Sequence, residues 1–223
     1  MRKKELAGYI DHTLLGAEVS SEAVERICEE AIEYGFKAVC TYPTYVSQAS
    51  DLLKDEKVRV CSVIGFPHGT HKRGVKAFEA QLAIEDGADE LDMVAKIPSL
   101  LNGDYEEVEK DIRSVVETAR NSPRDILVKV ILETCKLSRE QKKAGGILVQ
   151  AAGADFVKTS TGFAESGATK SDVKLLAETV GNNIGIKAAG GIKSYEDARS
   201  MINAGASRIG ASSGLEIISG SPD

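Results

Sequence analysis

The sequence repeats a short pattern in which an apolar helix end is followed by a glycine and then by an apolar strand. The pattern occurs in "AIEYGFKAVCT", "AIEDGADELDMV", "LVQAAGADFVKT" and "MINAGASRIGAS". Glycine is the expected residue just after a helix because it adopts the left-handed conformation that closes the last turn. The spacing of these glycines leaves room for about two strand–helix units between neighbours. The repeat therefore predicts a chain of alternating strands and helices.

Further strands are expected between these repeats. The segments "KVRVCSVIGF" and "DILVKVIL" are rich in β-branched residues, "IGIKAAGG" is a shorter strand, and "YIDHTLL" is a weaker one. The predicted strands cover residues 9–14, 36–42, 58–66, 89–95, 125–133, 156–161, 184–189 and 207–211. Amphipathic helices fit the segments between them, and Ser138-x-x-Gln141 and Ser194-x-x-Asp197 resemble the capping boxes that begin helices.

Eight strands that alternate with helices predict a parallel sheet covered on all sides. The count of eight favours a closed α/β barrel, the (β/α)8 TIM barrel, over an open doubly wound sheet. An open sheet that binds a dinucleotide would carry GxGxxG after its first strand, and no such motif follows that strand here. We therefore expect a single barrel domain over residues 1–223.

Composition and charge narrow the class of function. The 223 residues include 34 acids and 28 bases, for a net charge of −6, so a broad basic face for nucleic acid is not expected. The sequence has no run of about 18 apolar residues, so no membrane span is predicted. The N-terminal segment lacks the apolar core of a secretory signal. The four cysteines are scattered without a CxxC motif, which indicates reduced thiols in a cytoplasmic protein, with no disulfide framework and no zinc site.

Three lysines lie in strands where apolar residues are expected: Lys129 in "ILVKVIL", Lys158 in "DFVKTSTGF" and Lys187 in "IGIKAAGG". Lysine is seldom fully buried without a partner. One explanation for each is that a lysine protects an edge strand against aggregation. A closed barrel has no edge, however, so three such lysines indicate amines that reach the C-terminal mouth, where barrel enzymes have their active sites.

Clustered lysines favour a reaction through a neutral amine. A free lysine titrates near ~10.4, and lowering its pKa to roughly 7 requires about 4.6 kcal/mol of destabilisation of the ammonium form. Burial and a neighbouring cation can supply this amount, which would make one lysine a nucleophile toward a carbonyl carbon. In "DELDMVAKI", Asp92 lies inside a predicted strand, where it would pair with a buried lysine, relay protons beside an imine, or do both.

Three late strands end in small residues, in "TSTG" (159–162), "AAGGI" (188–192) and "GASSG" (210–214). Unobstructed backbone amides with interleaved hydroxyls can bind a phosphate group, and many barrels bind phosphate at the loops after strands seven and eight. Each run alone is weak, because tight turns between strands and helices need glycine in any case. Together, at the expected position, they predict a phosphorylated substrate.

The motifs "ELDMV" (90–94), "DFVKTSTGF" (155–163), "IKAAGGI" (186–192) and "RIGASSG" (208–214) resemble those of the 2-deoxyribose-5-phosphate aldolase family. "IDHT" (10–13) and "VCTYP" (39–43) extend the resemblance over nearly the whole chain. The resemblance implies a class I aldolase, a carbon–carbon lyase on a (β/α)8 barrel. Such an enzyme reversibly cleaves 2-deoxy-D-ribose 5-phosphate to acetaldehyde and D-glyceraldehyde 3-phosphate through a lysine Schiff base, without a metal or other cofactor.

The resemblance also implies roles for individual residues. Lys158 would form the Schiff base, Lys187 would favour its neutral amine and assist proton transfer, and Asp92 would exchange protons with the help of a water molecule. Asp11 and Cys40 would line the substrate end, and Lys129 would be a supporting cation. The residues implied for phosphate binding are Gly162, Gly190, Gly191, Gly210, Ser212 and Ser213. The implied partners are small phosphorylated sugars and aldehydes, with neither nucleic acid nor membrane, and further copies of the chain in a dimer or tetramer.

Two features depart from the family pattern. Some members have a lysine directly after "STG" that helps to bind phosphate, whereas this chain has Phe163, so backbone amides and serines would provide more of the phosphate contacts. Some members also end in a flexible tail with a terminal tyrosine, and we expect no such contribution from a chain that ends in "SGSPD".

Three other functions are compatible with parts of this pattern. His68 and His71 in "FPHGTH" have the spacing of metal ligands, as a class II aldolase would need, but no carboxylate or third histidine is near them in sequence. An isomerase or lyase that forms no imine could use the same barrel and phosphate site. A sugar-phosphate binding protein could as well, but it would leave the lysines and Asp92 without a role.

Overall fold

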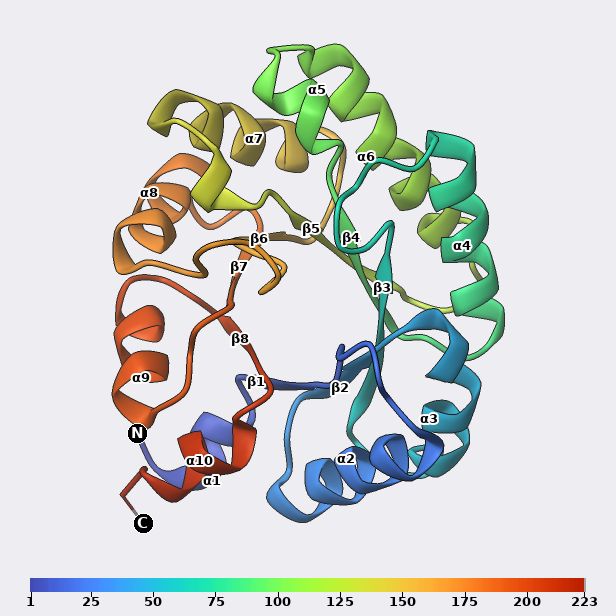
Figure 1. Cartoon of the computed structure of the whole chain (residues 1–223), viewed down its shortest axis with the longest axis vertical. Helices are drawn as coiled ribbons and strands as arrows, with labels where there is room; N and C mark the ends of the chain where they lie inside the picture. The colour runs from blue at the N-terminus through green and yellow to red at the C-terminus, as the bar shows by residue number, and fades with distance from the viewer. Residues whose placement is uncertain (223) are drawn as a thin grey trace.

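Eight parallel strands close into a barrel in the order β1 to β8, and β8 pairs with β1 to complete the ring (Figure 1). The computed structural model describes residues 1–222, so Asp223, the last residue of the predicted domain, lies outside the described residues. The strands are β1 (Ile10–Thr13), β2 (Ala38–Thr41), β3 (Arg59–Ile64), β4 (Glu90–Val94), β5 (Leu127–Ile131), β6 (Phe156–Lys158), β7 (Gly185–Ala189) and β8 (Arg208–Ala211). The predicted (β/α)8 TIM barrel is confirmed.

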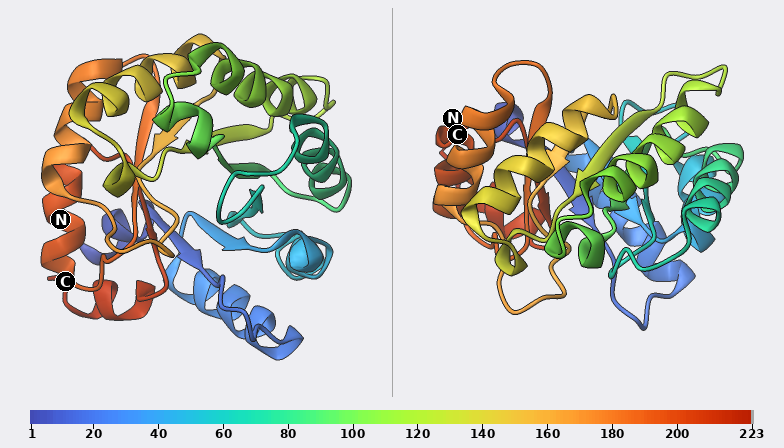
Figure 2. Two further views of the ribbon diagram at one scale, coloured as in Figure 1. Left: turned by 45° about the horizontal axis from the view of Figure 1, so that its top comes forward. Right: turned by 90° about the horizontal axis from the view of Figure 1, so that it is seen from above.

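Helices surround this ring on its outer side, as Figures 1 and 2 show. They are α1 (Lys3–Ala7), α2 (Ser21–Tyr34), α3 (Val46–Leu52), α4 (Arg73–Glu85), α5 (Ile97–Leu101), α6 (Tyr105–Arg120), α7 (Arg139–Ala151), α8 (Lys170–Val180), α9 (Tyr195–Asn203) and α10 (Gly214–Ser219). Two 3-10 helices, η1 (Pro43–Tyr45) and η2 (Thr134–Lys136), follow β2 and β5. None of the helices among residues 1–222 is both long and apolar enough to cross a membrane.

The ends of the elements follow the local signals in the sequence. Ser138 and Ser194 both form complete capping boxes, with Gln141 and Asp197 as their partners. The four glycines of the repeat, at positions 35, 87, 153 and 205, all have positive φ, as the left-handed helix stop requires. Each predicted strand corresponds to an observed one, although the observed strands are shorter.

The predicted strand 156–161 loses the whole of its C-terminal half, since only residues 156–158 are β6. The backbone leaves the sheet because Gly162 adopts a φ of 88° and Thr161 turns toward the loop after β5, where it bonds to Glu133. The three residues after Lys158 therefore belong to the loop at the C-terminal mouth of the barrel.

Alternation of side chains along each strand separates an apolar layer from a polar interior. In β4, Leu91 and Met93 point outward and join the main hydrophobic core between the strands and the helices. Glu90 and Asp92 point inward, where they meet charged side chains from the other strands. The outer layer thus stabilises the barrel by burial of apolar surface, which leaves the interior free to carry polar groups.

Candidate active site

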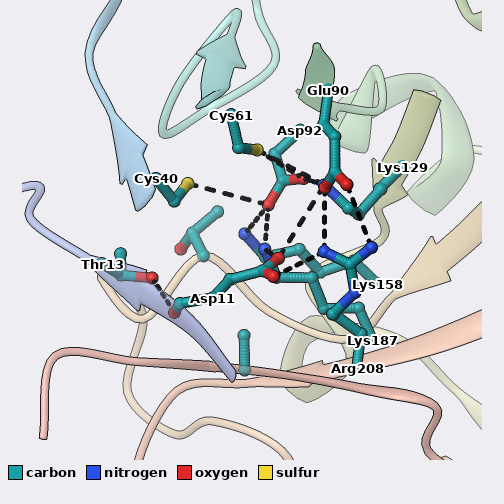
Figure 3. Close-up of polar contacts among 12 residues, drawn as sticks. Asp11, Thr13, Cys40, Cys61, Glu90, Asp92, Lys129, Lys158, Lys187 and Arg208 are labelled. Atoms are coloured by element: carbon teal, nitrogen blue, oxygen red, sulfur yellow. Dashed lines mark hydrogen bonds and ion pairs between the residues drawn. The ribbon is translucent and has the colours of Figure 1, made fainter. Parts of the chain in front are cut away.

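A cluster of charged side chains fills the centre of the barrel, with Asp92 at its middle (Figure 3). Lys158 Nζ and Lys187 Nζ both donate to Asp92 Oδ2, at 2.6 and 2.7 Å, and Lys129 Nζ donates to Oδ1 at 2.8 Å. The strands explain this convergence, because Asp92 pairs with Lys129 in the register of β4 and β5, and Lys158 pairs with Lys187 in that of β6 and β7. The three lysines singled out in the sequence therefore meet at one carboxylate.

A second part of the cluster lies around Asp11 on β1 and Arg208 on β8. Arg208 Nη1 donates to Asp11 Oδ1 at 2.6 Å, and the two Nη atoms of Arg208 bind the carboxylate of Glu90 at 2.9 and 3.0 Å. Lys187 also pairs with Asp11, so Asp11 connects Arg208 to the lysines. Lys129 Nζ is 2.6 Å from Glu90 Oε2. Every charge in this part of the barrel therefore has an opposite charge beside it.

The electrostatics of the cluster keep its carboxyl groups ionised. Burial raises the pKa of Asp11, but Lys187, Lys129 and Arg208 outweigh it and lower that pKa to about 2. The pKa of Asp92 is well below its usual value for the same reason, since Lys129, Lys158 and Lys187 outweigh burial. The pKa of Lys187 is raised, because Asp11 and Asp92 outweigh the burial that lowers it. Lys187 is thus a cation, and Asp92 is an anion.

Two thiols adjoin Asp92 on the side of β2 and β3. Cys40 and Cys61 are direct neighbours in the register of these strands, and Cys61 Sγ lies 3.2 Å from Asp92 Oδ1. The hydrogen bond from Cys61 lowers the pKa of Cys40, whereas burial raises that of Cys61 well above its usual value. All four cysteines are free in this structure.

These two thiols and Asp92 form the one group of three potential metal ligands found among the described residues, with ligand atoms within 4.8 Å of one another. Lys129 Nζ already contacts both Cys61 Sγ, at 3.4 Å, and Asp92 Oδ1. A metal ion bound there would have to displace a buried ammonium group. His68 and His71, the ligands considered for a class II aldolase, are both exposed and belong to no such group within residues 1–222.

A cavity of about 330 Å³ opens above the cluster at the C-terminal mouth. Lys158 is the lysine of the cluster that lines it, and its exposed fraction is 2%, against 0% for Lys129 and Lys187. The predicted phosphate-binding residues that line the same cavity are Gly162, Gly190, Gly191, Gly210 and Ser212. Ser213, predicted with them, precedes the first residue of α10 and is not among the lining residues. The amine of Lys158 and the glycine-rich strand ends therefore share one cavity.

Close backbone approaches account for two of these glycines. A Cβ atom at Gly190 would lie 2.9 Å from the Cα atom of Gly167, in the loop before α8. A Cβ atom at Gly210 would lie 2.9 Å from Cε of Lys187. Gly210 thus leaves the space that the Lys187 side chain occupies. The space is needed for the cluster whether or not Gly210 contacts a ligand.

Phe163 lies at the rim of the cavity with an exposed fraction of 54%. Its ring meets that of Phe66 edge to face, with 5.3 Å between the ring centroids. Lys193 also lines the cavity, on the side of Gly190 and Gly191. A cation is therefore present at the glycine-rich end of the cavity, but it comes from the loop after β7 and not from the position after "STG".

Glu90, Arg208 and Cys61 belong to the cluster but were not predicted as site residues. Arg208 and Glu90 carry the same signal as the lysines, a charge within an apolar strand, but each lies at the first position of its strand. At that position a charge is equally typical of an exposed strand end, so the sequence alone does not distinguish an exposed charge from one that points into the barrel. Both side chains point inward because of the strand register of the closed barrel.

Comparison with known proteins gives the same family along nearly the whole chain. The model of the DeoC/LacD family aldolases matches residues 6–220. The deoxyribose-phosphate aldolase of Exiguobacterium sp. is 54% identical over 217 residues, which cover 97% of this chain and 96% of the relative. That of Thermococcus kodakarensis is 53% identical over 225 aligned residues and covers all of both chains.

Solved structures agree with the sequence comparison. A crystal structure of a putative deoxyribose-phosphate aldolase from Coccidioides immitis superposes with a TM-score of 0.93 at 41% identity, covering 98% of this chain and 86% of that one. The deoxyribose phosphate aldolase of Aeropyrum pernix, whose structure is a tetramer, gives a TM-score of 0.91 at 37% identity, covering 97% and 91%. The closed barrel, the extent of the match and the level of identity together place this chain in the DeoC/LacD family of aldolases.

Proposed function

We propose that this protein is a class I deoxyribose-phosphate aldolase that uses Lys158 to form a Schiff base. The observation that carries the proposal is the place of Lys158, whose Nζ lies at the base of a cavity and 2.6 Å from Asp92 Oδ2. Asp92 can take the proton that Lys158 must lose before it attacks a carbonyl carbon. The substrate named for the related enzymes, deoxyribose phosphate, has both the aldehyde and the phosphate that this cavity would accommodate.

The reaction begins with the open-chain aldehyde of 2-deoxy-D-ribose 5-phosphate. Lys158 Nζ forms a bond to C1, and loss of water gives a protonated imine. A base then removes the proton of the C3 hydroxyl, the C2–C3 bond breaks, and its electron pair moves toward the iminium nitrogen to give an enamine. D-glyceraldehyde 3-phosphate leaves as the first product. Protonation of C2 and addition of water release acetaldehyde and restore the amine.

Two residues are suited to the proton transfers. Asp92 is ionised and contacts Lys158 directly, so it serves as the acceptor of the first proton and, through a water molecule, as the base and acid near C2 and C3. Lys187 stays charged on the same carboxylate oxygen, where its ammonium group stabilises the negative charge that develops on leaving oxygen atoms. Lys129 and Arg208 hold Asp92, Asp11 and Glu90 in place.

The phosphate group of the substrate binds at the ends of β6, β7 and β8 in this proposal. Gly162, Gly190, Gly191 and Gly210 offer backbone without side chains, Ser212 adds a hydroxyl, and Lys193 adds a cation at the rim. Ser213, with its side chain free of a capping bond, lies one residue beyond Ser212 and can contribute its amide. Asp11 and Cys40, expected at the substrate end, are both fully buried in the cluster and are not among the lining residues, whereas Thr13 lines the cavity.

We also propose that residues 1–223 act as one domain, in a cytoplasmic homo-oligomer. The closed barrel supports the single domain. The four free cysteines support a reducing compartment, and the tetramer of the Aeropyrum pernix relative supports assembly into a dimer or tetramer.

The test is cleavage of 2-deoxy-D-ribose 5-phosphate by the purified protein, with acetaldehyde and D-glyceraldehyde 3-phosphate both measured. We expect equal amounts of the two products, unchanged by a chelator, and no product with Lys158→Ala or with Lys158→Arg, which keeps the charge. Cleavage lost on chelation and restored by a divalent metal would instead identify a class II reaction. Undiminished cleavage by Lys158→Ala would refute the proposed role of Lys158.

A further inference from the structure

Glu133 lies outside the charged cluster, two residues after the end of β5, in the loop that faces the one after β6. Its φ of 58° and ψ of 64° place it in the left-handed region, and it is the one non-glycine residue within 1–222 with positive φ. Its exposed fraction is only 2%. A buried acid in a conformation that favours glycine is a local strain, and such strain is concentrated at functional sites.

The carboxylate of Glu133 binds one residue of the cavity loop through three contacts. The Thr161 backbone N–H donates to Oε1 at 3.3 Å and to Oε2 at 3.4 Å, and the Thr161 hydroxyl donates to Oε2. The Thr161 Oγ1 atom in turn accepts a hydrogen bond from the Phe163 N–H at 3.1 Å. Glu133 thereby fixes the backbone on both sides of Gly162, which lines the cavity between these two residues.

The position of Glu133 would weaken the binding of a phosphate group in the cavity, so a gain elsewhere must offset this loss. A carboxylate near a bound phosphate repels it, and the nearby cation Lys136 forms its ion pair with Glu165 and not with Glu133. The Thr161 N–H, which could otherwise bind the phosphate, is also occupied by Glu133. The gain that offsets these losses is the fixed conformation of the loop.

The other end of the same loop is held independently of Glu133. The Leu132 N–H donates to Lys158 O, and the Thr159 N–H donates to Lys187 O, both at 3.0 Å. The Thr159 hydroxyl accepts from the Ala189 N–H at 3.1 Å. Loss of the Glu133 carboxylate should therefore disturb Thr161 to Phe163 and leave Lys158 in place.

We propose that Glu133 is a positioning residue for the phosphate end of the substrate: its carboxylate sets Thr161, Gly162 and Phe163 in the conformation that accepts phosphate. This inference rests on the proposed aldolase function. It predicts that Glu133 determines the preference for a phosphorylated over an unphosphorylated sugar, and that it does not take part in imine formation.

The experiment compares kinetics on 2-deoxy-D-ribose 5-phosphate and on unphosphorylated 2-deoxy-D-ribose. In Glu133→Gln, the neutral amide keeps one acceptor oxygen for the two donors of Thr161 and loses the second acceptor together with the negative charge. We expect KM for the phosphorylated sugar to rise about tenfold and kcat to change less than about twofold, with kcat/KM for the unphosphorylated sugar unchanged. The control is Glu165→Gln, in which an exposed acid of the same loop loses its contact with Lys136. It should leave all of these values unchanged.

Two further variants separate positioning from stability. Glu133→Gly removes the carboxylate but relieves the positive φ, so we expect an equal or higher Tm together with the same rise in KM. Thr161→Val removes the hydroxyl that Thr161 donates to Glu133, and it should also raise KM for the phosphorylated sugar. An equal loss on both sugars, or an unchanged KM in Glu133→Gln and Glu133→Gly, would overturn the inference. Failure of the proposed aldolase function would give a different result, since the unaltered protein would then cleave neither sugar. That result would overturn both the proposed function and the inference about Glu133.

Discussion

At the scale of single residues, the central feature is the burial of four cations with three carboxylates inside one barrel. Lys129, Lys158, Lys187 and Arg208 are all at most 3% exposed, and each of them is paired with at least one of the three carboxylates of Asp11, Glu90 and Asp92. Removing a charge from water is costly unless an opposite charge accompanies it, so each residue of the cluster depends on the others. We expect substitution of Asp92 to disturb the cluster most, because three lysines share its two carboxylate oxygen atoms.

The change Asp92→Asn tests this position. The amide keeps the shape of the side chain but can neither accept the proton of Lys158 nor balance three ammonium groups. We expect kcat to fall by about 10²–10⁴, the range associated with loss of a general acid or base. Circular dichroism should still report the barrel. A kcat within a few-fold of the unaltered protein would contradict the proposed role of Asp92.

The sequence predicts the lysines and Asp92 because a charge within an apolar strand is unusual wherever it occurs. It does not predict their partners. Arg208 and Glu90 lie on opposite sides of the barrel, and their contact depends on the closure of the sheet, which no local pattern encodes. The contact of Glu133 with Thr161 likewise joins two loops that are 28 residues apart in the chain.

At the scale of elements, helices α4 and α6 support the end of the strand that carries Asp92. Lys76 on α4 and Asp111 on α6 form a fully buried ion pair at 2.6 Å. Lys76 Nζ also donates to the carbonyl of Val94, the last residue of β4, at 2.8 Å. This pair links two helices to β4 through Asp111 Oδ2, and the buried Oδ1 atom of Asp111 has no hydrogen-bond partner within residues 1–222.

The substitution Lys76→Met tests how much the ion pair between Lys76 and Asp111 contributes to the stability of the fold. It leaves the Asp111 carboxylate buried without a cation, and burial already raises the pKa of Asp111 despite Lys76. We expect the free energy of unfolding in urea to fall by about 3–5 kcal/mol. The double variant Lys76→Met/Asp111→Leu should recover most of this loss, since no charge then remains buried. Equal destabilisation in the single and double variants would contradict the account.

The order of the elements and most of their positions follow from the sequence, because helix stops, capping boxes and strand patterns are local. The end of β6 does not follow. "TSTG" has the β-branched residues of a strand, yet it forms a loop because the Thr159 hydroxyl bonds to β7 and the Thr161 N–H bonds to Glu133. A tertiary contact therefore determines where this strand ends.

At the scale of the whole molecule, eight similar units close a barrel whose inside is charged and whose outside is apolar. The repeat of helix, glycine and strand predicts this closure, because it gives the number of strands and their parallel order. The interior charges also connect the stability of the barrel to pH. Asp11, Asp92 and Glu90 all have pKa values below their usual range, since the cations around them outweigh burial.

A carboxyl group with a lowered pKa in the folded state stabilises that state at pH values above its unfolded pKa. This stabilisation is lost as the pH falls through the folded pKa. For Asp11 the pKa falls from 3.8 to about 2 on folding, so the loss occurs between about pH 4 and pH 2 and amounts to about 2 kcal/mol. We expect the difference in unfolding free energy between the unaltered protein and Asp11→Asn to shrink by this amount over that range. A difference independent of pH would contradict the lowered pKa.

The central claim is that Lys158 forms an imine, and borohydride trapping tests it most directly. The protein is incubated with acetaldehyde, reduced with borohydride, and examined by intact mass and peptide mapping. The account predicts one stable two-carbon adduct, located on Lys158 and absent from Lys158→Ala, with Lys129 and Lys187 unmodified because they lie below the cavity. Stoichiometric recovery of unmodified protein, or an adduct on Lys187 in place of Lys158, would contradict it.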